Sequence, residues 1–194
     1  MMLGWITSWL RPAPIPASAP AYPPSLIDAD EYIARARAWR DTGRYDLRCG
    51  TGPRGATSPL NAQGRSNCSR YVLFLWGLPG LLPDDLTCAG YGEVNTTAMW
   101  HEARGTNGGR RVLLVEVPVS EAQVGDATVY PGVTVGGVRV KIGHTGGIVA
   151  VPAGCTSIAD MRISHCNAGP APAIDETNGR GFAAKGAIVV RLAG

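Results

Sequence analysis

One cysteine stands where the sequence favours nucleophilic chemistry. Cys68 follows a loop rich in Gly, Pro, Ser and Asn and opens an apolar run, a pattern that predicts the first turn of a helix capped by Ser66 or Asn67. A thiol in that turn feels the positive end of the helix dipole, which favours the thiolate. The backbone amides of Cys68 and Ser69 have no helical acceptor there and can hold an oxyanion. The alternative is that Cys68 is a small core residue.

Two histidines lie on predicted strands. Strand alternation places His144 on one face with Val140 and Ile142, and we expect this face to be the core face. His165 shares a face with Ile163 in the same way. An inward histidine is either a hydrogen-bonded core residue or a catalytic base. If His144 is a base for Cys68, a second ring beside it would orient it and set its tautomer. Otherwise His165 is an unrelated buried polar residue.

The remaining cysteines are Cys49, Cys88, Cys155 and Cys166. No CxxC spacing occurs and histidines are few, so we expect no zinc site and no cofactor. These four cysteines allow two disulfides, as in a protein that works outside the cytoplasm, or four reduced buried thiols.

The 194 residues predict one domain with an arm. Residues 1–24 begin with a short apolar stretch and continue with many prolines, so we interpret them as a Pro-rich arm or linker before a domain at 25–194. The apolar stretch is too short to cross a membrane and lacks the basic start of a secretory signal. The net charge of +3 comes from scattered arginines, which does not favour nucleic-acid binding.

Periodicity predicts helices first and strands afterwards. A helix is expected over 26–42, with Ser25 and Asp28 at its start and Gly43 at its end, and a buried central helix over 67–76. Short strands are expected at 112–117, 127–130, 138–142, 147–151, 161–166 and 187–192. This order predicts an α+β fold with an antiparallel sheet.

Four short blocks make the chain resemble the NlpC-type cell-wall cysteine peptidases and their CHAP-type relatives over roughly 30–194. The blocks are Asn67-Cys68-Ser69-Arg70, Gly125-Asp126-Ala127, Gly143-His144-Thr145-Gly146-Gly147-Ile148-Val149 and Ile163-Ser164-His165-Cys166. The resemblance implies a papain-like fold with the Cys-bearing helix packed on the sheet. It also implies that Cys68, His144 and His165 are catalytic and that Ser69 contributes to the oxyanion site.

The chain departs from the family pattern in several places. Asn67 replaces an aspartate, and Arg70 replaces a glycine where it would crowd or extend the substrate groove. Relative to the family pattern, Gly147 is an extra residue before Ile148, and we expect it to form a bulge in the strand. The family places a tyrosine near the substrate carbonyl, for which Tyr45 is the candidate, and Asn167 is an alternative to His165 as third residue.

The function implied by the resemblance is hydrolysis of peptide or amide bonds in the peptidoglycan stem peptide, by a monomer without metal or cofactor. We expect it to act in the periplasm or cell wall of a target bacterium, as a phage lysin, a tail-associated enzyme or a secreted antibacterial effector. A delivery partner or immunity protein is not identified by the sequence. The alternatives are an acyltransferase or non-wall peptidase on the same scaffold, or a non-catalytic phage or wall-binding module.

Overall fold

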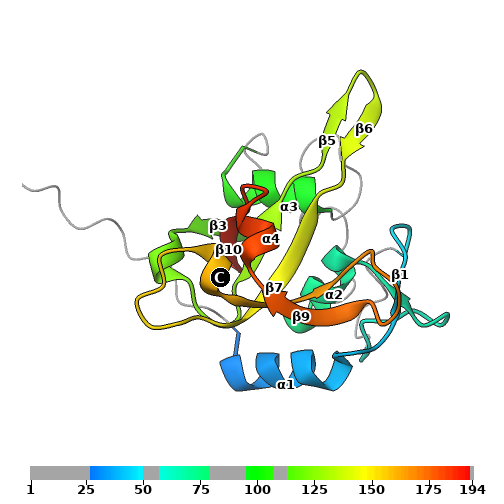
Figure 1. The fold of residues 1–194 in the computed structure, drawn as a ribbon, viewed down its shortest axis with the longest axis horizontal. Helices are drawn as coiled ribbons and strands as arrows, with labels where there is room; N and C mark the ends of the chain where they lie inside the picture. The colour runs from blue at the N-terminus through cyan, green and yellow to red at the C-terminus, as the bar shows by residue number, and fades with distance from the viewer. Residues whose placement is uncertain (1–26, 50–56, 79–94, 107–112, 193–194) are drawn as a thin grey trace, which may run out of the picture.

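The computed structural model describes residues 27–49, 57–78, 95–106 and 113–192 (Figure 1). The helices are α1 (Ala29–Trp39), α2 (Cys68–Leu75), α3 (Thr96–Ala103) and α4 (Arg180–Ala183). The strands are β1 (Arg44–Tyr45), β2 (Arg65–Ser66), β3 (Leu114–Val117), β4 (Ala127–Tyr130), β5 (Val133–Val135), β6 (Val138–Lys141), β7 (His144–Ala150), β8 (Arg162–Cys166), β9 (Ile174–Asn178) and β10 (Ile188–Leu192). Within these ranges no helix is long and apolar enough to cross a membrane.

Six strands form the main sheet, in the order β3-β10-β4-β7-β8-β9, and every neighbouring pair is antiparallel. The predicted α+β class with an antiparallel sheet is therefore confirmed. The strand pair β1–β2 and the helices α3 and α4 were not predicted, and neither were β5 and β9. The register of β7 against β8 shifts between Ile148 and Ala150, so the bulge lies there, whereas Gly147 pairs regularly with Ser164.

Side-chain caps set the starts of the two N-terminal helices. The Asp28 carboxylate accepts a 2.8 Å hydrogen bond from the amide of Glu31 and caps α1, which begins at Ala29. Ser25 and residue 26, where the helix was expected to start, lie outside the described residues. The helix ends at Trp39, before the expected limit at 42. In α2 the Asn67 side chain accepts a hydrogen bond from the Arg70 amide. All residues of α2 are buried, as its all-round apolar sequence predicts.

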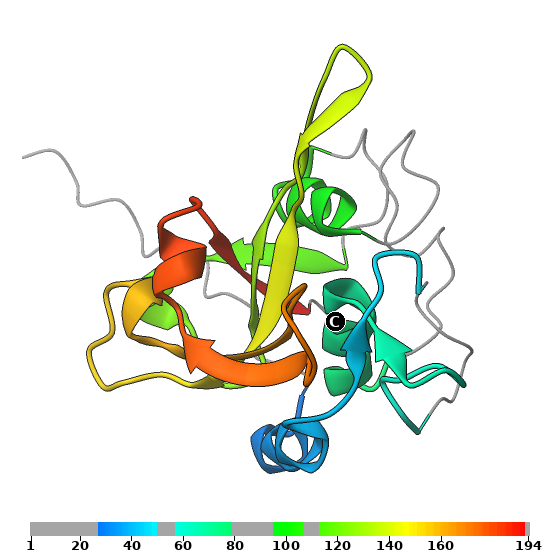
Figure 2. The same ribbon diagram turned by 45° about the vertical axis from the view of Figure 1, so that its right-hand side comes forward.

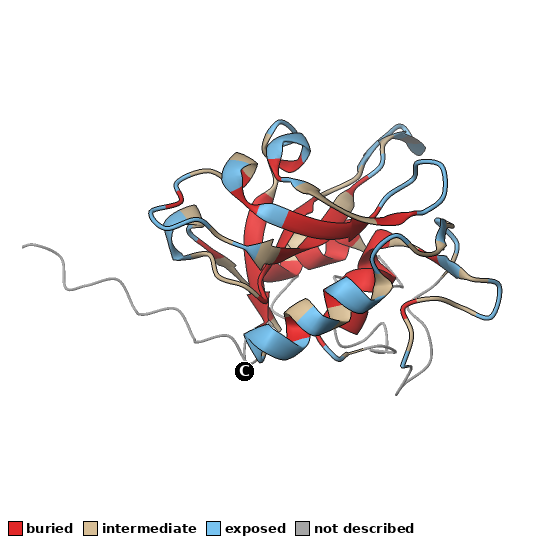
Figure 3. Cartoon of the chain, turned by 60° about the horizontal axis from the view of Figure 1, so that its bottom comes forward, coloured by how far each residue is buried: buried red, intermediate tan, exposed pale blue. Residues whose placement is uncertain are grey.

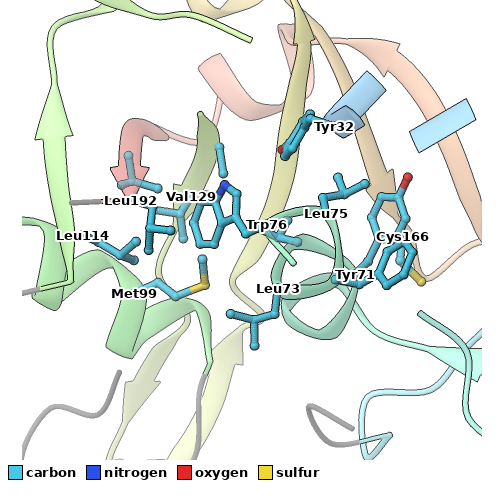
Figure 4. Close-up of a cluster of buried hydrophobic side chains, with 14 of the residues drawn as sticks. Tyr32, Tyr71, Leu73, Leu75, Trp76, Met99, Leu114, Val129, Cys166 and Leu192 are labelled. Atoms are coloured by element: carbon cyan, nitrogen blue, oxygen red, sulfur yellow. The ribbon is translucent and has the colours of Figure 1, made fainter. Parts of the chain in front are cut away.

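Apolar layers cover both faces of the sheet (Figure 3). On one face α1, α2 and α3 pack on β4, β8 and β10; Figure 4 shows part of this core, with Tyr32, Leu73 and Trp76 among its large side chains. The Trp76 indole donates a 2.8 Å hydrogen bond to the Gly125 carbonyl, which satisfies the buried ring nitrogen. On the other face Phe182 of α4 packs with residues of β4, β7 and β8.

The strands β5 and β6 form a hairpin that stands out from the sheet (Figures 1 and 2). Its apolar side chains are exposed, including Val140 at 61% and Ile142 at 52%. The prediction that both face the core with His144 is therefore wrong. The strand is interrupted before His144, and among the described residues β6 pairs only with β5 and is covered by no further layer.

The cysteines that the structure describes form no disulfide. Cys49, Cys155 and Cys166 are free thiols, as is Cys68. Cys88 lies outside the described residues. Two disulfides would need Cys88 and all three of Cys49, Cys155 and Cys166. Because these three are free thiols, the alternative with two disulfides is excluded.

Candidate active site

Cys68 is the first residue of α2 and is buried, with 5% of its surface exposed. Potential hydrogen-bond donors lie near its sulfur, namely the backbone amides of Thr145, Ser69 and Cys68 itself and the hydroxyl of Ser69. Each of these donors lowers the pKa of the thiol, but burial is the larger effect and raises the pKa above its usual value. The resting group is therefore a neutral thiol surrounded by donors that favour its anion.

The imidazoles of His144 and His165 are joined by a hydrogen bond. His144 Nε2 lies 2.8 Å from His165 Nδ1, and His165 Nε2 lies 3.2 Å from the hydroxyl of Thr177 on β9. The expected contact between the two histidines is thus present. Asn167 is exposed, and its side-chain oxygen accepts a hydrogen bond from the amide of Ala168, so it is not the partner of His144.

Both histidines are neutral near physiological pH. Burial, then the neighbouring His165 and then Lys185, lower the pKa of His144 to about 3. Burial also lowers the pKa of His165, with Asp175 opposing the effect. Two imidazoliums in contact would repel each other, so the hydrogen bond between them is one between neutral rings.

The hydrogen-bond chain allows only two consistent tautomers. If His144 carries its proton on Nε2, it donates to His165 Nδ1, and His165 Nε2 donates to Thr177. This arrangement leaves His144 Nδ1 as a proton acceptor, which is what a general base requires. The reversed arrangement places a proton on His144 Nδ1 and blocks that role.

An aromatic wall holds the two imidazoles. The Phe182 ring stacks on His144 at 5.3 Å and 23°, and meets His165 edge-on at 5.6 Å and 78°. Tyr130, the cross-strand partner of His144, lies 6.1 Å from it between ring centroids. Sequence reasoning missed Phe182, Tyr130 and Thr177. Phe182 and Thr177 lie on α4 and β9, which carry no recognisable motif, and the position of Tyr130 beside His144 follows from the register of β4 against β7.

Two glycines of β7 bring layers close on opposite faces. A Cβ at Gly146 would lie 2.9 Å from the Cβ of His165, and a Cβ at Gly147 would lie 2.7 Å from Leu75 of α2. Larger residues would therefore push away the histidine pair on one face or the Cys-bearing helix on the other. It follows that the imidazoles lie on the face covered by α4, while α2 packs on the opposite face.

Cys68 meets this strand at its first residues, where α2 begins. The backbone amide of Thr145, directly after His144, lowers the pKa of the thiol, and the pKa of Tyr130 beside His144 is raised by burial and then by the negative form of Cys68. The hydrogen bonds found among the described residues include none between Cys68 and His144. Because His165 occupies Nε2, Nδ1 is the atom of His144 that must approach the sulfur for proton transfer.

The other residues expected in the site lie around α2. Tyr45 of β1 pairs with Ser66, two residues before Cys68, so it reaches this region although it is distant in sequence. Arg70 is buried, and its guanidinium donates to the carbonyls of Pro59 and Leu60 at 2.6 and 3.2 Å. Arg70 therefore holds the loop before β2 instead of reaching into open space.

His101 lies on α3, where its Nδ1 contacts the hydroxyl of Thr106 at 2.8 Å. Across the described ranges, no three His, Cys, Asp or Glu side chains come together as a possible metal site.

No protein-family model matches this chain, and no curated protein matches its sequence.

Proposed function

We propose that this protein is a papain-like cysteine hydrolase that cleaves peptide or amide bonds of bacterial peptidoglycan. The observation that carries the proposal is the buried Cys68 thiol at the start of α2, near the first residues of β7, where His144 is hydrogen-bonded to His165 of β8. A nucleophile, a candidate base and an orienting partner are the parts that thiol acyl transfer needs. The resemblance of four sequence blocks to those of NlpC-type and CHAP-type enzymes supports the substrate class.

The proposed reaction begins with transfer of the Cys68 proton to His144 Nδ1. Because the thiol and the imidazole are both neutral at rest, His144 acts as a general base and not as half of a preformed ion pair. The thiolate attacks the amide carbonyl, and the amides of Cys68 and Ser69 stabilise the oxyanion. His144 then protonates the leaving amine, and water releases the acyl group from the sulfur.

His165 and Thr177 contribute by holding the base in position. As His144 gains a proton on Nδ1, its Nε2–H continues to donate to His165, and this bond strengthens because the donor becomes charged. Phe182 restricts the rotation of the His144 ring by stacking on it. The proton is thereby exchanged at one defined nitrogen.

Digestion of purified sacculi, followed by mass analysis of the soluble fragments, tests this function. The full chain should release peptide fragments with new amino termini, and Cys68→Ala should release none. If the full chain binds sacculi without releasing fragments, the protein is a wall-binding module and the proposal is wrong. If it transfers an acyl group to an added amine but leaves sacculi intact, it is an acyltransferase.

A further inference from the structure

The two lysines of the chain converge on one ring beside the candidate site. Lys141 ends β6 and Lys185 follows α4, and they are the only lysines in the sequence. The Lys141 Nζ lies 5.0 Å from the centroid of the Tyr130 ring, and the Lys185 Nζ lies 5.8 Å from it. Lys141 also donates to the carbonyl of Lys185 at 3.4 Å. Two ammonium groups thus stand over Tyr130, the cross-strand neighbour of His144.

Among the described residues no carboxylate forms an ion pair with either lysine. Every ion pair found in the described part of the chain joins an arginine to an acidic residue, and none includes Lys141 or Lys185. The cation–π contact with Tyr130 offsets only part of the repulsion between two ammonium groups. The neighbouring imidazoles are neutral, so the lysines set the local charge, which is positive.

We propose that Lys141 and Lys185 form a subsite for a carboxylate of the substrate close to the scissile amide. The inference rests on the proposed function and adds to it that the protein recognises a carboxylate of the substrate. A stem peptide linked through the side-chain carboxyl of D-glutamate keeps a free α-carboxylate, three carbon atoms from the scissile carbonyl. Such a group would place its charge between two ammonium donors while the carbonyl faces Cys68.

The subsite separates anionic substrates from their neutral amides. Replacing the α-carboxylate of D-glutamate by a carboxamide removes the charge and keeps the shape. A hydrogen-bonded ion pair of this kind is expected to change affinity by about tenfold to a hundredfold. The full chain should therefore have a lower KM for the carboxylate peptide than for its amide, by about that factor.

The test measures both peptides with three doubly substituted proteins. Lys141→Gln with Lys185→Gln should lose the preference, while Lys141→Arg with Lys185→Arg should keep it. Arg37→Gln with Arg48→Gln removes the same charge from exposed positions on α1 and after β1, and should keep the preference. If the glutamine pair discriminates as well as the unsubstituted chain, or the two arginine-to-glutamine changes abolish discrimination equally, the subsite is disproved.

Binding separates this outcome from failure of the proposed reaction. Calorimetric affinities of the two peptides for Cys68→Ala report recognition without turnover. Discrimination that disappears when both lysines become glutamine supports the subsite even if the full chain hydrolyses neither peptide, which would refute the reaction alone. Hydrolysis of both peptides with equal affinity for Cys68→Ala would refute the subsite and leave the reaction standing.

Discussion

Two polar pairs lie in the same sheet, a partly buried neutral pair and a buried ionic pair. His144 and His165 share a 2.8 Å hydrogen bond between neutral rings on β7 and β8. Asp126 and Arg191, before β4 and on β10, form an ion pair through two hydrogen bonds of 2.8 and 2.9 Å. The ionic pair is buried and the histidine pair is partly buried, and in one of its two tautomers the histidine pair leaves His144 Nδ1 as a proton acceptor.

The two side chains of the ionic pair also make hydrogen bonds to the backbone around them. Arg191 also donates to the carbonyl of Glu121, and the Asp126 carboxylate also accepts from the amide of Gln123. Burial raises the pKa of Asp126, and Arg191 opposes that effect. The difference between the pairs teaches that burial alone does not mark a functional group. What distinguishes the histidine pair is a ring nitrogen, His144 Nδ1, that takes part in none of the hydrogen bonds found among the described residues.

The largest expected effect is on Cys68. Cys68→Ala should lower the rate of hydrolysis by about 10⁴-fold or more, because the nucleophile is lost. The thermal midpoint should change little, since a small side chain is removed. Fragment release from sacculi and thermal unfolding measure the two quantities. A residual rate within tenfold of the full chain would exclude Cys68 as nucleophile.

Breaking the ionic pair should cost stability. Arg191→Met leaves the Asp126 carboxylate buried without its cation, which should lower the free energy of unfolding by about 3–5 kcal/mol. Adding Asp126→Asn should recover part of this loss, because the unpaired charge disappears. Urea unfolding of both proteins measures the difference. Equal stability of Arg191→Met and the full chain would show that the pair does not hold the sheet.

Breaking the neutral pair should lower the rate of hydrolysis more than it lowers the stability of the fold. His165→Ala should slow hydrolysis by about 10- to 1,000-fold, because His144 loses the partner that sets its tautomer and steadies its charged form. His101→Ala, on α3, is the matched control and should retain full activity. Steady-state kinetics with a stem peptide compares them. A full rate for His165→Ala would remove that residue from the site.

The neutral pair should also make stability depend on pH. The pKa of His144 falls from 6.5 to about 3 on folding, so between these values the unfolded chain binds more protons. The free energy of unfolding should therefore rise from pH 3 to 6.5 and gain nothing further from this group above that. His144→Asn should show a shallower rise in urea unfolding across the same range. An identical slope in both proteins would contradict the buried neutral state of His144.

The smallest effect is expected from removing residues 1–24. Both pairs lie between residues 126 and 191, and the cap of α1 is supplied by Asp28. A chain that begins at Ser25 should fold and hydrolyse stem peptide at the rate of the full chain. Circular dichroism and the same kinetic assay decide this. Insolubility or loss of activity would place the arm within the domain.

The sequence alone determined the local parts of this protein. A polar cap at Ser66 or Asn67 followed by an apolar run predicts the buried α2 and the position of Cys68 at a helix start, because capping and burial periodicity act over a few residues. The structure shows that Asn67 is the cap. Most strands of the sheet were predicted for the same reason. Alternation failed at Val140 and Ile142 because it cannot show whether another layer covers a strand.

Only the tertiary structure decided how the parts meet. Several contacts join segments that only folding brings together. His144 is hydrogen-bonded to His165, and Phe182 stacks on His144. Arg70 donates hydrogen bonds to the carbonyls of Pro59 and Leu60. Such contacts depend on strand register, on the close approach allowed by Gly146 and on the placement of α4. Local residue pattern does not encode these distances, because they arise from packing between distant segments.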